Sequence, residues 1–211
     1  MTNQEPPQQA SVERAANDPD LPELIARSLG GDQTAFAALY ERYAPALYRL
    51  AYSVLLDQQD AEDVLQESMV YAFRNLDRYD PARGAFRTWL YTITISRCRN
   101  ARRRKWLPTI TLGHLLTLGV EPPTAPADSP EARAAWRELQ ASLAEALRTL
   151  SPRLREAVAL RYGQGLTYRE MAEIMDCPQK TAESRVRLAH EQLRKAMSAA
   201  DQAALHELWS L

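Results

Sequence analysis

Apolar residues along the chain recur three or four positions apart, which is the spacing of a buried helix face. In the N-terminal half, this spacing predicts helices over about 21–29, 33–54, 61–76 and 86–105. The first of these helices ends at Gly30-Gly31, Asp32 caps the second, and the apolar spacing of the first comes from Leu21, Leu24, Ile25 and Leu29. The β-branched run 92–95 also fits a strand, but no partner strand is visible and Phe86, Leu90 and Ile93 share one helical face.

The C-terminal half continues the helical pattern, with helices that begin at Ser129-Pro130 and at Ser151-Pro152. Two shorter segments then flank the tetrad Asp176-Cys177-Pro178-Gln179, whose proline is expected to stop the first of them. After the tetrad, one apolar stripe runs along the helix: Ala182, Val186, Ala189 and Leu193. Two short helices around a tight turn predict a helix-turn-helix, whose second helix enters the DNA major groove. An ordinary helical hairpin with a solvated polar face is the alternative.

Segments without this periodicity divide the chain into parts. Residues 1–19 are polar and contain few large apolar side chains, so we expect them to be disordered. Residues 107–130 contain five prolines and no Lys or Arg, which is typical of a semi-stiff linker. The sequence therefore predicts an all-α protein with two small helical domains, 20–106 and 131–197, a flexible linker between them and a C-terminal tail, 198–211.

The formal net charge of −1 over 211 residues is unusual for a nucleic-acid-binding protein, but the charge is unevenly distributed. Residues 20–106 contain thirteen Lys and Arg against eleven Asp and Glu, and residues 131–197 contain twelve against nine. The tails and the linker are acidic. Local basic clusters matter more for nucleic-acid binding than the total charge does.

Composition also argues against several classes of protein. No apolar run approaches the roughly 18–20 residues that span a bilayer, and the polar N-terminus does not resemble a signal peptide, so a cytoplasmic protein is expected. Cys98 and Cys177 lie far apart and lack clustered histidines, which disfavours a disulfide or a zinc site. We therefore expect no cofactor and no metal.

Two charged surfaces are candidates for binding. Six Lys and Arg fall within 97–105, after a segment rich in aromatic residues, a mixture typical of contacts to phosphates and unpaired bases. A solvated basic helix end is the alternative. An acidic face comprises Asp60, Glu62, Asp63, Gln66 and Glu67. Charge alone favours a solvated surface there, and a metal or hydrolase site lacks a histidine or a second acidic helix.

Three segments in order carry a resemblance to a known family: DAEDVLQESMVYAF at 60–73, YDPARGAFRTWLYTI at 79–93, and LSPRLREAVALRYGQGLTYREMAEIMDCPQKTAESRVRLAHEQLR at 150–194. In this combination the chain resembles bacterial extracytoplasmic-function (ECF) sigma factors of the sigma-70 family, from about residue 21 to 197. The resemblance implies a promoter-specificity subunit of RNA polymerase with no catalysis of its own.

The resemblance also implies a role for each candidate surface. The acidic face would dock on the β′ clamp helices of core RNA polymerase, in place of the solvated surface that charge alone favours. Contacts to the promoter −10 element and the melted strand would come from Tyr79, Arg83, Phe86, Trp89, Ser96, Arg97, Arg99, Asn100, Arg102 and Arg103. Arg104 would also hold phosphate. Contacts to the −35 element would come from Lys180, Thr181, Glu183, Ser184, Arg185, Arg187, Leu188 and His190. An anti-sigma factor is a further expected partner.

The chain departs from the family pattern at several DNA-facing positions. Ser96 stands where asparagine is frequent, and Glu183 and His190 stand where basic residues are usual. A carboxylate accepts from cytosine N4 but repels phosphate, so the −35 sequence does not follow from relatives. Two other functions compete with the sigma-factor hypothesis. A stand-alone helix-turn-helix regulator would need a receiver or ligand-binding domain with alternating strands, and a helical hydrolase would need a second set of carboxylates.

Overall fold

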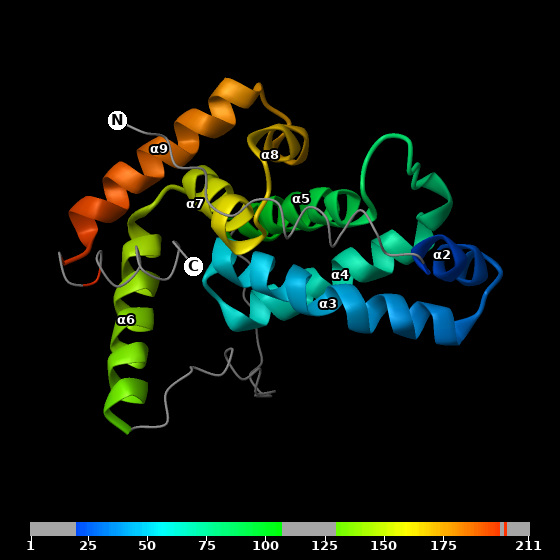
Figure 1. Cartoon of the computed structure of the whole chain (residues 1–211), viewed down its shortest axis with the longest axis horizontal. Helices are drawn as coiled ribbons and strands as arrows, with labels where there is room; N and C mark the ends of the chain where they lie inside the picture. The colour runs from blue at the N-terminus through cyan, green and yellow to red at the C-terminus, as the bar shows by residue number, and fades with distance from the viewer. Residues whose placement is uncertain (1–19, 107–129, 199–200, 202–211) are drawn as a thin grey trace.

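The computed structural model describes residues 20–106, 130–198 and 201. This part of the chain is helical and contains no strand, so the predicted all-α class is confirmed. Its elements, shown in Figure 1, are α2 (Leu21–Leu29), α3 (Gln33–Leu55), α4 (Gln58–Arg74), η1 (Leu76–Arg78), α5 (Phe86–Trp106), α6 (Pro130–Thr149), α7 (Pro152–Val158), η2 (Ala159–Gly163), α8 (Tyr168–Met175) and α9 (Gln179–Ala196). The predicted disordered segment 1–19, residues 107–129 of the predicted linker 107–130 and most of the C-terminal tail lie outside the described residues.

The N-terminal body is built on α3, which packs against α2, α4 and α5. Asp32 caps α3 as predicted, because its carboxylate accepts from the amides of Thr34 at 2.8 Å and Ala35 at 3.4 Å. Asp57 caps α4 in the same way. One predicted packing residue is wrong. Leu29 is 55% exposed, and Ser28 is buried in its place.

The C-terminal body contains the predicted helix-turn-helix, α8 and α9. Thr167 and Glu170 form a capping box at the start of α8, in which each side chain bonds to the other residue's backbone amide. The helix ends at Asp176, whose φ of 52° is left-handed, and Pro178 occupies the N-cap of α9. Helix α8 therefore ends before the tetrad as predicted, but the left-handed Asp176 ends it and the proline does not. The predicted apolar stripe of α9 is buried.

The helix that begins at Ser151-Pro152 changes from α-helical to π-helical part-way along. It is α-helical only to Val158 and continues as one π-helical turn, Ala159–Gly163. Arg161, in this turn, is buried and donates to the Leu166 carbonyl oxygen at 2.9 Å, while its guanidinium lies over the Tyr168 ring. Through these two contacts of Arg161, the π turn fixes the start of the helix-turn-helix against the preceding helix.

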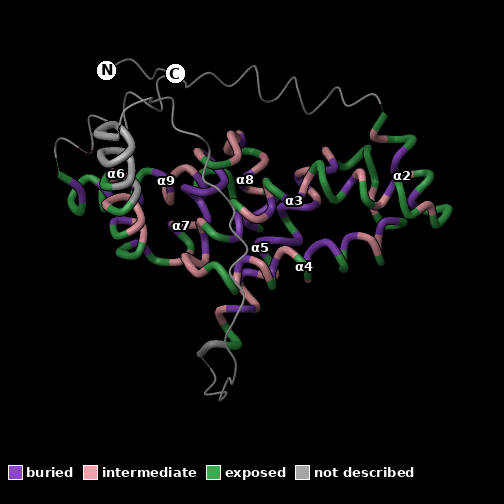
Figure 2. Tube along the Cα trace, turned by 90° about the horizontal axis from the view of Figure 1, so that it is seen from below, coloured by how far each residue is buried: buried purple, intermediate pink, exposed green. Residues whose placement is uncertain are grey.

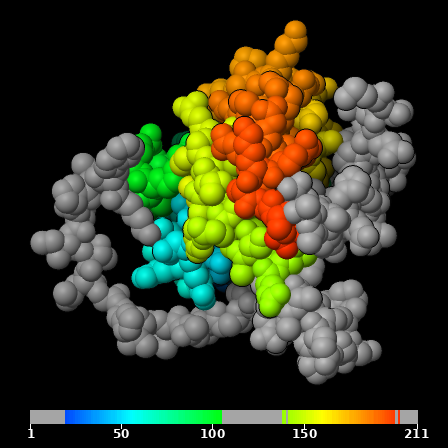
Figure 3. All heavy atoms as spheres, turned by 90° about the vertical axis from the view of Figure 1, so that its left-hand side faces the viewer, coloured from blue at the N-terminus to red at the C-terminus, as the bar shows by residue number. Residues whose placement is uncertain are grey.

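The two bodies, expected to be separate domains on a flexible tether, pack directly against each other. Helices α3 and α5 contact α7, η2 and α8, and one hydrophobic cluster runs continuously from Leu24 to Val186. Figure 2 shows buried segments where these helices lie side by side. A smaller cluster joins α6, α7 and α9, and Figure 3 shows α6 and α9 together on one face of the molecule.

None of the helices that the structure describes is long and apolar enough to cross a membrane.

Candidate nucleic-acid interface

The predicted promoter-binding residues of α5 lie on three different faces of the helix. Trp89, Ser96, Asn100 and Arg103 are separated by seven, four and three residues, so they fall on one stripe. Each is exposed or half-buried. This outward stripe presents an aromatic ring, a hydroxyl, an amide and a guanidinium in order along one helix, a set of groups that can contact both bases and phosphates.

An aromatic cluster stands at the start of α5. The Phe86 ring lies 4.9 Å from the Tyr79 ring and 5.5 Å from the Trp89 ring, between centroids, and the Tyr79 hydroxyl donates to the Gly84 carbonyl oxygen at 3.2 Å. Phe86 is only 2% exposed. In this conformation it supports the half-buried Tyr79 and Trp89 rings from behind and does not reach solvent. Arg83 is exposed in the turn that precedes the helix.

A second face of α5 is directed toward α4. The Arg97 guanidinium lies over the Tyr71 ring at 4.6 Å from its centroid. Near the end of the helix, Arg104 pairs with Glu67 at 2.9 Å, and Arg103 donates to the Asn100 side chain. Glu67 of the predicted polymerase-binding face is therefore partly neutralised by the basic helix beside it.

The third face of α5 is directed toward the C-terminal body, which sequence reasoning did not anticipate. Arg99 donates to Glu156 with Nη2–Oε2 at 2.7 Å, and Arg102 donates to the same carboxylate at 3.2 Å. The Glu156 side chain has no exposed surface, and its hydrogen bonds raise the pKa of Arg99. Both arginines were predicted to hold nucleic acid. The one sequence signal for this contact was a single carboxylate beside the apolar run 157–160.

Two further contacts extend this inter-body interface toward the start of α5. The Tyr91 hydroxyl donates to the Gln164 side-chain oxygen at 2.8 Å, and Arg87 pairs with Glu170 at 3.3 Å. Burial raises the pKa of Tyr91, so its hydroxyl remains a donor at neutral pH. One side of α5 is thus covered along most of its length.

The acidic face predicted on α4 is present as a surface. Asp63 and Gln66 are exposed, while Asp60, Glu62 and Glu67 are half-buried. Glu62 accepts from the Gln58 amide at 3.0 Å, which orients its carboxylate along the helix. Two exposed apolar residues, Val70 and Tyr71, follow on the same helix. Charged groups beside exposed apolar side chains are the usual make-up of a protein-binding surface.

On α9 the predicted DNA-reading residues do not all face the same way. Lys180, Arg187 and Leu188 are exposed. The other residues predicted to contact the −35 element are half-buried: Thr181, Glu183, Ser184, Arg185 and His190. Arg187 pairs with Glu191 at 3.0 Å on the open face.

His190 lies on the flank of α9, where its ring stacks on Tyr162 at 5.1 Å between centroids. Burial lowers the pKa of His190, so it is neutral at pH 7. A neutral imidazole packed on a tyrosine contributes to the contact between α9 and the π turn, and sequence spacing alone did not reveal this.

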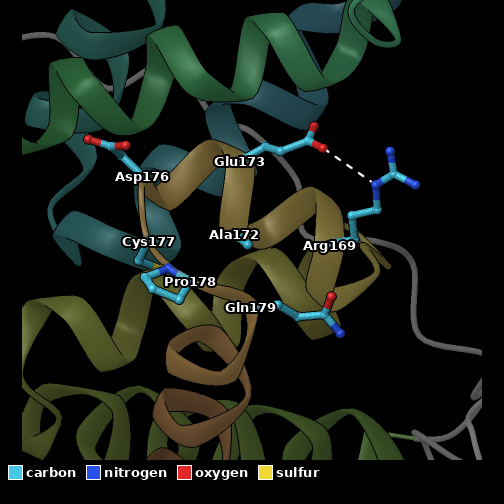
Figure 4. A pocket seen from close by; sticks show the side chains of 7 residues that line it. All are labelled: Arg169, Ala172, Glu173, Asp176, Cys177, Pro178 and Gln179. Carbon is cyan, nitrogen blue, oxygen red and sulfur yellow. Dashed lines mark ion pairs between the residues drawn. The ribbon is translucent and has the colours of Figure 1, made fainter.

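The turn between α8 and α9 has a hollow at its surface, shown in Figure 4 and lined by Arg169, Ala172, Glu173, Asp176, Cys177, Pro178 and Gln179. On one side of it, Arg169 and Glu173 pair along α8 at 3.6 Å. Among the residues described, no group of three His, Cys, Asp or Glu side chains is placed to hold a metal ion. Burial raises the pKa of Cys98 to about 12, which keeps that thiol protonated.

Comparison with known proteins matches both bodies to one family. A family model for Sigma-70 region 2 matches residues 39–107, and one for Sigma-70 region 4 matches residues 140–193. The chain is 31% identical over 171 residues to the ECF RNA polymerase sigma factor SigW of Bacillus subtilis, covering 79% of this chain and 91% of that protein. The chain belongs to the ECF group of the sigma-70 family.

Other sigma factors give the same result. RNA polymerase sigma-H factor of Pseudomonas aeruginosa is 31% identical over 83% of this chain and 92% of its own length. Among solved structures, CnrH in complex with the cytosolic domain of CnrY superposes with a TM-score of 0.58 at 26% identity, covering 82% of this chain and 94% of that chain. Sigma factor RpoE of Bartonella quintana, solved with the anti-sigma factor NepR, shares the fold at a TM-score of 0.56 and 24% identity, covering 76% and 95%.

Proposed function

We propose that this sigma factor binds core RNA polymerase and directs it to promoters through two DNA contacts, one on α5 and one on α9. The observation that carries the proposal is that one chain of this family presents an acidic helix face, an aromatic and basic helix, and a helix-turn-helix. The last two surfaces are chemically suited to unpaired and duplex DNA respectively.

The α5 contact would act at the −10 element. The half-buried ring of Trp89 and the polar groups of Ser96 and Asn100 form a surface on which a base unstacked from the duplex can rest. Unstacking costs a few kcal/mol, which new stacking and hydrogen bonds must offset. Arg97 and Arg103, with the turn residue Arg83, would hold the strand's phosphates and hinder reannealing.

The α4 face would bind core polymerase. It lies on a different helix from the outward stripe of α5, so one body can contact polymerase and DNA at once. The carboxylates of this face, beside the exposed Val70 and Tyr71, would complement a basic and partly apolar partner surface. By the family resemblance that surface is the pair of β′ clamp helices.

The α9 contact would read the −35 element from the major groove. Lys180 and Thr181 stand in its first turn, where a recognition helix approaches base edges, and Arg187 stands nearly two turns further along the exposed face. Because linked contacts reinforce one another, each DNA contact can be individually weak when both are held by polymerase.

Arg187→Ala is expected to reduce discrimination at one position of the −35 element. A guanidinium that bonds to a guanine edge contributes about 1–3 kcal/mol of discrimination. The measurement is holoenzyme affinity for promoters that carry each base at each −35 position, with and without the substitution. A uniform loss across all sequences would show instead that Arg187 contacts only phosphate.

The proposed subunit supplies specificity and strand opening, while bond formation belongs to polymerase, so it acts in the cytoplasm and is not an enzyme. An anti-sigma factor is a proposed partner, as in the solved complex of the related RpoE with NepR. A stand-alone regulator is the alternative, and the described residues contain no strand from which a receiver domain could be built. The test is reconstitution, because only a sigma factor gives core polymerase promoter-specific starts.

A further inference from the structure

The contact between the two bodies occupies two arginines that the family resemblance assigns to nucleic acid. Arg99 and Arg102 both donate to Glu156, at 2.7 Å and 3.2 Å. A carboxylate and a phosphate satisfy a guanidinium through the same oxygen acceptors. While Glu156 is in place, a DNA phosphate therefore cannot take the same donors of these two side chains.

The environment of Glu156 makes this contact specific. The carboxylate is fully buried between the bodies, although a charged group is rarely buried unless it is paired. Two guanidiniums meet both of its oxygens, so the charge is compensated only while the bodies are together. If the bodies part, Glu156 regains water and the arginines become available.

The dimensions of a promoter require such a separation. The −35 and −10 elements are centred about 25 base pairs apart by their names, which is roughly 85 Å at about 3.4 Å per base pair. Helix α8 of the helix-turn-helix lies directly against α5, the helix assigned to the −10 element. In this arrangement the two reading elements cannot both reach their sites.

We propose that Glu156 holds the two bodies of the free chain together in a closed form, in which its carboxylate takes the place of a DNA phosphate. It would bind Arg99 and Arg102 in this way until the two bodies separate on core polymerase. Tyr91–Gln164 and Arg87–Glu170 complete the closed interface without contributing to DNA recognition. A partner that stabilises the closed form would inhibit transcription, and a partner that stabilises the open form would activate it. This inference rests on the proposed sigma-factor function.

The test measures the distance between the bodies and the affinity for DNA in the same full-length chains. Donor and acceptor dyes are attached to unnatural amino acids at Glu23 on α2 and Lys195 on α9, both exposed. Binding is measured with a fluorescent oligothymidine of about 16 nucleotides, enough to cover a single-strand site. Variants are Glu156→Gln, which weakens the charge pairing, and Gln164→Ala, which alters the interface without changing charge. Glu145→Gln, at an exposed carboxylate of α6, is the matched control.

Glu156→Gln should lower energy transfer and raise DNA affinity by about tenfold if the closed form is about 90% populated in the wild type. Gln164→Ala should likewise lower energy transfer and raise DNA affinity. If Glu156→Gln does not fold, the result for Gln164→Ala alone tests the proposal. Glu145→Gln should change neither. Higher DNA affinity with unchanged energy transfer would overturn the proposal, since Glu156 would then only repel DNA locally. Unchanged values for both readouts would overturn it too.

Core polymerase added to the wild type should also lower energy transfer. If transfer stays high while the holoenzyme transcribes from promoters, the closed form is not a barrier, and only this inference fails. If no promoter-specific transcription occurs with any variant, the proposed function itself fails.

Discussion

Replacing Glu62 and Asp63 together by Lys is expected to weaken binding to core polymerase by more than about a hundredfold. The substitution places two positive charges on the proposed docking face, and like charges brought together at an interface cost several kcal/mol. Asp63 is exposed and Glu62 is half-buried at the surface of α4, so the fold should tolerate both changes. Affinity is measured by titrating labelled sigma factor with core enzyme.

The matched control for this pair is Glu23→Lys with Glu41→Lys, the same change of charge on exposed residues of α2 and α3. It should bind core polymerase within about twofold of the wild type, as expected for charges outside an interface. Thermal unfolding should confirm that both double variants remain folded. Equal core affinity in the two double variants would show that the acidic face of α4 is not the docking surface.

The second large effect is expected at the end of α5. Arg103→Ala with Arg104→Ala removes two exposed guanidiniums and leaves the Glu156 pairs intact. Loss of two phosphate contacts to a single strand should lower the dependence of log affinity on log salt by about 1.4. Open complexes at saturating holoenzyme should fall by more than about tenfold near 0.15 M salt. The measurement is the formation of open complexes over a salt series.

Arg27→Ala with Arg148→Ala removes two exposed arginines from α2 and α6, and it serves as the control for charge alone. This control should keep the wild-type salt slope. If the α5 variant also kept that slope, its arginines would not contact phosphate, and the strand-holding role assigned to this helix end would be wrong.

Much of the fold was predictable because local signals and burial agree. Asp32 caps α3, the β-branched run 92–95 is helical, and the stripe Ala182, Val186, Ala189 and Leu193 is buried. These features depend on neighbours within one or two turns of the same helix. The prediction that Leu29 packs inward was wrong because it lies in the last turn of its helix. A side chain there can extend beyond the packed part of the helix, so periodicity no longer determines its burial.

The failures in the site share a different cause, which is contact between distant segments. The pairing of Arg99 and Arg102 with Glu156 joins residues more than fifty positions apart. Helical periodicity relates only residues within one helix, so it does not predict such a contact. Phe86 was assigned to DNA by motif, but packing against Tyr43 and Tyr79 buries its ring. His190 was likewise placed by motif and stacks on Tyr162. The motifs identify the surfaces, while packing decides which side chains are available.

Reconstituted transcription on sheared genomic DNA from the organism that encodes this chain tests whether the protein directs promoter-specific initiation. Purified core polymerase is incubated with the DNA, with or without the full-length protein, and the 5′ ends of the run-off transcripts are sequenced. We expect a discrete set of new start sites that share sequence elements near −35 and −10 and disappear with the Glu62 and Asp63 double variant. Start sites identical to those of core polymerase alone would contradict it.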